Sequence, residues 1–144
     1  MHTQLKMRYL DLKKKHTMEN EKANINDNTV GVLAYITLIG FIIAIVLNSN
    51  KEGEEKKFGA FHLRQALGMI IFAVGAYILI FLLTTILMSI SWALLTIVSF
   101  ISLLLWLGIL ALLILGIINA ANKTYKEVPV IGKFSSKLLG STFE

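Results

Sequence analysis

Hydrophobic residues fill two long stretches of the chain, and polar segments surround them. The first stretch runs from Val30 to Leu47, and the second runs from Ala66 to Ile118 without one Lys, Arg, Asp, Glu or His. No soluble domain of this size could bury so long an uncharged run, because polar residues must cover its surface. The pattern therefore predicts an all-α integral membrane protein built as a helical bundle.

The second stretch is too long for one transmembrane helix and too short for four, since a hydrocarbon core of about 30 Å needs roughly 20 residues per helix. Two helices of about 25 residues fit if they are tilted. The small polar residues around Ser89 and Ser91 mark the turn between them, next to Trp92. Together with the first stretch, the sequence predicts three transmembrane helices, at about residues 30–47, 66–90 and 93–118.

Polar segments connect and follow these helices. Residues 48–57 have the composition of a solvated loop, with Gly53 as its turn. The segment from Phe58 to Gln65 is predicted to be an interfacial helix that leads into the second span, because aromatic residues and long cations suit the headgroup zone.

The end of the chain, residues 128–144, is predicted to form a turn and a short interfacial segment. Pro129 stops a helix, and Gly132 permits a turn. Ile131, Phe134 and Leu138 then recur at helical spacing with lysines beside them, which favours a short helix on the membrane surface. A frayed tail is the alternative.

Residues 1–28 are polar and lack the apolar core of a signal peptide, so a disordered tail is expected before the membrane domain at 29–127. The tail changes from Lys-rich to acidic and Asn-rich at Met18. We hypothesise that Met18 is the natural start, which an intact-mass measurement of the native protein would test.

Charge adds an orientation and excludes some chemistry. The net charge is +5, only 16% of residues are charged, and cysteine is absent, which excludes disulfides and thiolate chemistry. No basic motif with interleaved aromatic residues predicts nucleic-acid binding. The 48–65 loop and the chain after Ile118 carry eight Lys and Arg between them, which places both in the cytoplasm, more clearly if Met18 rather than Met1 is the start.

One polar cluster adjoins the long hydrophobic stretch, and it consists of His62, Arg64 and Gln65. These side chains could bind a polar ligand, a lipid headgroup or a polypeptide backbone; alternatively, they anchor the tail or a loop through hydrogen bonds. No carboxylate accompanies them on an ordered element, so no acid–base catalysis is predicted. The three histidines, His2, His16 and His62, are scattered, so neither a metal site nor a cofactor is expected.

Small residues within the hydrophobic stretches predict close helix packing. Four of them have suitable spacing: Gly68, Gly75, Gly116 and Ala120. Serines and threonines in the same helices are expected to bond the carbonyl four residues back, or else to form a polar seam for a substrate or a sister subunit. No charge falls at mid-membrane, which argues against an ion-coupled carrier.

Three fragments resemble a family of small bacterial membrane proteins that is related to the import component of the translocon at the chloroplast inner envelope. They are Phe58-Gly-Ala-Phe-His-Leu-Arg-Gln-Ala-Leu-Gly68, Pro129-Val-Ile-Gly132 and Gly31-Val-Leu-Ala-Tyr35. The resemblance covers about residues 28–135. It implies an all-helical protein of the bacterial cytoplasmic membrane and, for the plastid relatives, polypeptide translocation. The signature positions that it assigns here are His62, Arg64, Gln65, Pro129 and Gly132.

Three functions follow as hypotheses. The first is a non-catalytic role in polypeptide translocation or membrane assembly, with membrane lipids, membrane or translocating polypeptides and other copies of the chain as partners. The second is a small oligomeric channel or carrier. The third is a lipid-modifying enzyme with His62 as its base. We favour the first, because the sequence offers helix-packing residues and no catalytic set.

Overall fold

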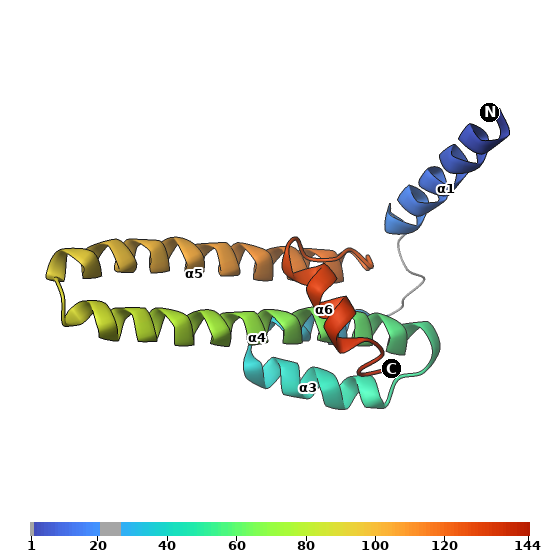
Figure 1. The fold of residues 1–144 in the computed structure, drawn as a ribbon. Helices are drawn as coiled ribbons and strands as arrows, with labels where there is room; N and C mark the ends of the chain where they lie inside the picture. The colour runs from blue at the N-terminus through green and yellow to red at the C-terminus, as the bar shows by residue number, and fades with distance from the viewer. Residues whose placement is uncertain (1, 21–26) are drawn as a thin grey trace.

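The structure is a computed structural model that describes the backbone of residues 2–20 and 27–144, and the side chains of 3–10, 12, 13 and 27–144. The described residues are helical apart from turns and short connections (Figure 1). The helices are α1 His2–Asn20, α2 Thr29–Ile36, α3 Leu38–Ser49, α4 Gly53–Met88, α5 Trp92–Ala121 and α6 Ile131–Leu139. This agrees with the all-α fold that the sequence predicts.

Helices α4 and α5 form a long antiparallel hairpin (Figure 1). Both are long and apolar enough to cross a membrane. Their turn lies at residues 89–91, as predicted, and the Ser91 hydroxyl caps α5 by accepting a hydrogen bond from the Ala93 amide at 3.3 Å. From residue 70 to residue 108 no side chain is buried. We call this part the distal hairpin, and its apolar surface is suited to lipid.

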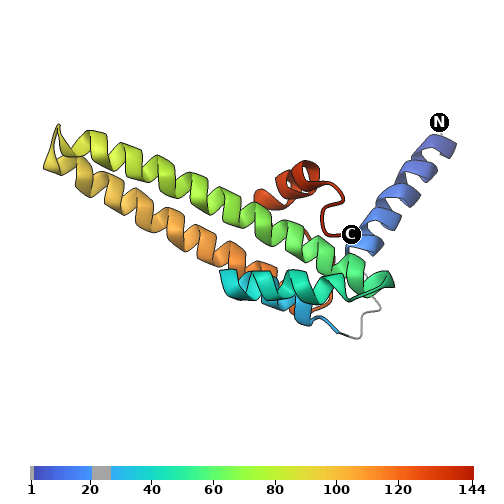
Figure 2. The ribbon, with the colours of Figure 1, turned by 90° about the horizontal axis from the view of Figure 1, so that it is seen from below.

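The remaining elements pack together at the other end of the hairpin (Figure 2). We call this part the base; it comprises α2, α3, residues 53–69 of α4, residues 109–121 of α5, and the chain from 122 to the end. Among the described side chains, every buried one lies here. The first half of α4 is the centre of the base, because α2, α3, α5 and α6 all contact α4.

The helix predicted at 30–47 is not one continuous span. The backbone becomes extended at Thr37, with φ −152° and ψ 166°, and the chain reverses into α3. The Thr37 hydroxyl accepts a hydrogen bond from the Gly40 amide at 2.9 Å and caps the new helix. A Cβ on Gly40 would lie 2.8 Å from the Leu33 carbonyl oxygen, so glycine allows α3 to fold closely onto α2.

The two short helices return the chain to the end from which it started. At 1.5 Å per residue, α2 and α3 measure about 12 and 18 Å, each too short to span a core of about 30 Å. Lys51, after α3, pairs with Asp27, before α2, at 2.8 Å. Hydrogen bonds from Lys51 and Thr29 hold the pKa of the Asp27 carboxyl well below its usual range. We call α2 and α3 the re-entrant pair. The structure thus has two helices long and apolar enough to cross a membrane, α4 and α5, where the sequence predicts three.

Two further expectations differ from the structure. Most of the predicted disordered tail is helix α1, which contacts no other helix among the described residues. Its sequence contains no Gly or Pro and is rich in Leu, Lys and Met, which favour helix without tertiary support; residues 21–26 lie outside the described part. The predicted interfacial helix at 58–65 is continuous with α4 and largely buried, because the base packs around it.

Candidate functional site

His62 and Gln65 lie one turn apart on α4, at the centre of the base. Both side chains are fully buried, with 0% and 1% exposure. They point toward the irregular segment that follows α5, where the chain passes back over α4 before α6 begins. The structure therefore brings together the predicted residues of α4 and those around Gly132.

Both ring nitrogens of His62 have partners. Nε2 lies 3.1 Å from the Thr124 carbonyl oxygen, and Nδ1 lies 3.0 Å from the Tyr35 hydroxyl. A carbonyl can only accept, so Nε2 carries the proton and Nδ1 accepts from the hydroxyl. Phe58 and Phe61 pack edge-on against the imidazole, at 4.5 and 5.1 Å between ring centroids. The neutral imidazole is thus fully used within the fold.

Gln65 holds the start of α6. Its Oε1 accepts a hydrogen bond from the Val128 amide at 3.1 Å, and its Nε2 donates to the Gly132 carbonyl at 3.2 Å and to the Ser136 hydroxyl at 3.1 Å. A Cβ on Gly132 would lie 2.6 Å from Oε1, so the site needs a glycine. The role of Gly132 is this close approach inside α6, not the turn that the sequence suggested.

The turn before α6 is formed one residue later than Pro129. The Ile131 amide donates to the Pro129 carbonyl at 2.7 Å, and Val130 between them has φ 66° and ψ −57°. This is a γ-turn in a conformation that a β-branched residue adopts only under strain. Pro129 is exposed, and its contribution is its fixed φ and its carbonyl.

Arg64 binds the last residues of the chain. Its guanidinium donates to the Thr142 carbonyl at 3.3 Å and pairs with the Glu144 carboxylate at 2.7 Å. Asn48 of α3 donates to the Phe143 carbonyl at 3.0 Å. The C-terminal residues are therefore fastened across α3 and α4.

These contacts have one physical purpose. The segment 122–130 is irregular, so its backbone groups lack helix partners, and unpaired groups in a buried place cost free energy. His62 and Gln65 supply partners for Thr124, Val128 and Gly132. The geometry matches the alternative in which the polar cluster anchors the tail, and no polar atom of His62 or Gln65 is left for a ligand.

We call the contacts of His62 and Gln65 with this segment and Gly132 the clamp. Tyr125, which belongs to the segment itself, adds further contacts to α4. Its ring packs against Phe58 and Phe61 at 5.5 and 5.4 Å between centroids, and its hydroxyl donates to the Glu54 carbonyl at 3.4 Å. Burial, together with the nearby charge of Glu54, raises the pKa of Tyr125 to about 12, so the hydroxyl keeps its proton.

Three of the four predicted packing residues lie at close contacts. A Cβ on Gly68 would collide with Ser135 of α6, and one on Gly116 would lie 2.5 Å from the Tyr35 ring. Ala120 is fully buried and adjoins Gly31. Gly75 differs, because a Cβ there would meet nothing within 4 Å; it lies on the exposed distal hairpin, where α4 has only α5 as a neighbour.

Three hydroxyl groups of the long helices bond to their own backbone. Thr85 donates to Phe81, Ser99 to Leu95 and Ser102 to Val98, each to the carbonyl four residues back, at 2.7–2.9 Å. They are thus satisfied inside their helices, as the packing interpretation of these residues predicts.

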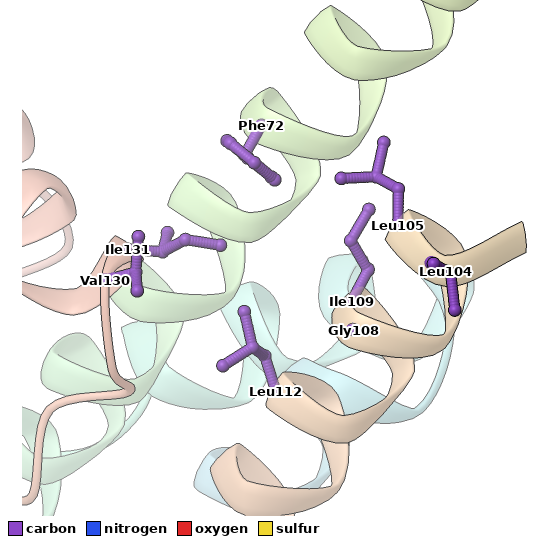
Figure 3. Close-up of a pocket in the computed structure, with 8 residues that line it drawn as sticks. All are labelled: Phe72, Leu104, Leu105, Gly108, Ile109, Leu112, Val130 and Ile131. Atoms are coloured by element: carbon purple, nitrogen blue, oxygen red, sulfur yellow. The ribbon is translucent and has the colours of Figure 1, made fainter. Parts of the chain in front are cut away.

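An apolar cavity opens where the distal hairpin meets the base (Figure 3). It has a volume of ≈ 330 Å³ and is walled by α4, α5 and the turn before α6. Its lining residues are Phe72, Leu104, Leu105, Gly108, Ile109, Leu112, Val130 and Ile131. All are apolar, so the cavity fits a hydrocarbon chain and offers no group for catalysis.

Sequence reasoning did not find several partners in this cluster. Tyr35, Asn48 and Thr124 were not singled out, although each binds a predicted residue or the tail. Asn48 directly follows the first hydrophobic stretch, and an amide side chain at that place was the available signal in the sequence. Within the described residues, no three His, Asp or Glu side chains come together in a way that could hold a metal ion.

Comparison with known proteins gives one family. The chain matches the magnetosome magnetite crystal formation protein family (MamF/MmsF) over residues 26–135. The chain belongs to this family. The match runs from the start of the re-entrant pair into α6 and includes the clamp of His62, Gln65 and Gly132. No curated protein and no solved structure matches the chain. A small bacterial membrane family is thus confirmed, whereas nothing found supports the resemblance to the chloroplast import component.

Proposed function

We propose that this MamF/MmsF-family protein supports magnetite crystal formation from within a bacterial membrane, as a non-catalytic organising component. In this role it works through its membrane-embedded surfaces and its base, and it does not bind the mineral. The family supplies the process. The distribution of polar side chains supplies the mode of action.

The observation that carries the proposal is the absence of ionisable groups at the end of the distal hairpin, which would lie on the far side of the membrane from the base. The distal hairpin ends in the turn 89–91, and no charged residue occurs between Ala66 and Ile118. Iron ions and iron-oxide surfaces are hard Lewis acids that favour carboxylate and other oxygen ligands. A turn that offers two serine hydroxyls and no carboxylate is a poor surface for them.

The charged residues all lie outside residues 66–118, in the base, the loop after α3 and the N-terminal segment, and we place these parts on the other side. All 14 Lys and Arg fall before Ala66 or after Ile118, and the re-entrant pair returns the chain to the base. With two spans, the N-terminal segment, the loop after α3 and the C-terminal segment share one side. The positive-inside rule then makes this side cytoplasmic, which removes the conflict between N-terminal and C-terminal charges that three spans create.

Polypeptide translocation is not favoured by this geometry. The face of α4 that carries His62 and Gln65 was the proposed binding surface, and the chain's own residues 124–136 occupy it. A translocating chain could reach these side chains only after the clamp opened.

The proposal is tested by expressing the chain in a magnetite-forming bacterium that lacks its own member of the family. We expect crystal size, measured by electron microscopy, to move toward that of the parent strain. A double variant of the far turn, Ser89→Ala with Ser91→Gly, is expected to do the same, because glycine retains most of the helix-capping effect and the hydroxyls are not used.

The results divide the possibilities. Restoration by the wild-type chain and loss with the far-turn variant, at equal membrane abundance, would show that the turn contacts the mineral and would overturn the proposed mode of action. No restoration by either chain, with both present in the membrane, would overturn the proposed role itself.

A further inference from the structure

The two ends of the molecule differ in width. The distal hairpin contains two helices, whereas the base adds α2, α3 and α6 around them (Figures 1 and 2). Each added helix has a diameter of about 10 Å with its side chains. If the added helices touched only water, this asymmetry would not affect a membrane, so their outer surfaces decide the matter.

The outer surface of the re-entrant pair is apolar. Ile39 is 71% exposed, and the corner between the two helices has no charged residue. The exposed apolar side chains are Ile36, Leu38, Ile39, Ile42, Ile43 and Val46. On the opposite face, Phe41 and Ala44 are buried in the base. So large an exposed apolar surface beside two membrane-spanning helices is suited to lipid chains.

Helix α6 has the same character, with cations added. Ile131 and Ser135 face the base, whereas Val130, Phe134 and Leu138 are exposed. The exposed Lys133 and Lys137 lie beside this apolar stripe on the helix. An amphipathic helix with flanking lysines lies in the plane of an anionic membrane, with its apolar stripe among the acyl chains.

Both elements reach a similar level along α4. Ser135 of α6 packs on Gly68. Asn48 near the end of α3 packs on Gly59, and the pair therefore extends about ten residues along α4 to its corner, which also lies near Gly68. From this level the distal hairpin continues for about 19 residues, or about 28 Å, which matches the hydrocarbon thickness.

We propose that the re-entrant pair and α6 form a wedge that enters the base-side leaflet only and bends the membrane so that this leaflet becomes convex. Their apolar surfaces lie at the boundary between headgroups and acyl chains and displace lipid there in one leaflet, whereas only two helices cross the other. Lys133 and Lys137 bind the headgroups of anionic lipids and hold α6 at this depth. The inference rests on the two-span topology proposed above.

The test uses the full-length protein and vesicles of phosphatidylethanolamine and phosphatidylglycerol. When the protein inserts from detergent into preformed vesicles, the uncharged turn crosses and the charged base stays outside. The wedge then lies in the outer leaflet. We expect vesicle diameter, measured by cryo-electron microscopy, to fall as the protein density rises, with tubules at the highest density.

Paired variants separate the wedge from general effects of membrane insertion. Ile39→Ala with Ile42→Ala removes apolar volume from α3, and Phe134→Ser with Leu138→Ser removes the stripe of α6. Both are expected to lose most of the decrease in diameter. Ile78→Ala with Ile86→Ala removes similar side chains from the distal hairpin, where both isoleucines are also exposed. This variant should retain the decrease in vesicle diameter.

Topology is read in the same vesicles by labelling Thr3→Cys, Ser89→Cys and Ser141→Cys variants from outside. Vesicles of unchanged diameter, with Thr3→Cys and Ser141→Cys labelled and Ser89→Cys protected, would overturn the wedge and leave the two-span topology intact. Equal effects of the distal and base variants would also overturn the wedge. Labelling of Ser89→Cys, or protection of Thr3→Cys while Ser141→Cys is labelled, would instead show that the two-span topology itself is wrong.

Discussion

At the scale of single residues, Gln65 fixes where α6 begins. One amide bonds to Val128 before the strained turn and to Gly132 after it. A Cβ at Gly132 would lie within 3 Å of both this amide and Glu127, so a larger residue there would have to displace one of them. A motif that suggested ligand binding thus serves to fold the chain back onto itself.

Replacement of Gln65 by Leu should release this segment. The substitution leaves the buried Val128 amide and Gly132 carbonyl without partners, at a cost of about 2–4 kcal/mol. We expect a lower midpoint of thermal unfolding in detergent and faster trypsin cleavage after Lys126 and Lys133. Thr85→Val is the matched control, because that hydroxyl bonds only to Phe81 of its own helix. Equal cleavage rates in the wild type and Gln65→Leu would contradict the clamp.

At the scale of secondary-structure elements, the packing of α6 on α4 depends on Gly68. Ser135 is fully buried against Gly68 and donates to the Ile131 carbonyl at 2.9 Å. A side chain at position 68 would therefore push α6 away from α4. Gly75, two turns further along the same helix, faces no neighbour. The two glycines look alike in the sequence and differ only in what packs on them.

Alanine substitutions should separate these two positions. Gly68→Ala overpacks the contact with α6 and should lower stability by about 1–3 kcal/mol. Gly75→Ala adds a methyl group into open space and should raise helix stability by about 0.5–1 kcal/mol. Thermal unfolding in detergent measures both. A destabilising Gly75→Ala would indicate a packing partner that the single chain lacks, such as a second copy.

The long helices could be predicted from the sequence, and the re-entrant pair could not. Charge-free runs determine α4 and α5 almost alone, because only helices satisfy the backbone in lipid. Residues 30–47 have the same apolar composition, and their length allows either a marginal span or a hairpin. The choice depends on tertiary contacts, such as Tyr35 against Gly116 and Asn48 against Gly59. The local signal was Thr37 followed by Gly40, a helix cap inside an apolar run.

The candidate site shows a similar division. His62, Gln65 and Gly132 were identified by their chemistry and spacing, because buried polar groups next to an apolar run need a reason. Their partners could not be identified, since Thr124 and Val128 contribute backbone groups, which any residue has. Polar side chains that bind main chain leave no complementary residue type to find.

At the scale of the whole molecule, two helices are long and apolar enough to cross a membrane, where the sequence predicted three. Asn28 at the start of α2 donates to the carbonyls of Ala120 and Ala121 at the end of α5, at 3.2 and 3.0 Å. The N-terminal segment therefore leaves the base beside the C-terminal segment. A three-span arrangement would place these two segments on opposite sides of the membrane.

Cysteine labelling in cells can distinguish these arrangements, because the chain has no cysteine of its own. We expect Thr3→Cys and Ser141→Cys to react alike with a membrane-impermeant maleimide, and Ser89→Cys to react in the opposite way. All three positions are exposed, so access depends only on the side of the membrane. Ser141→Cys and Ser89→Cys differ in both topologies and act as internal controls. Thr3→Cys is the deciding position, because reactivity like that of Ser89→Cys would restore the three-span arrangement. The six N-terminal Lys and Arg residues would then no longer support the cytoplasmic assignment of the base.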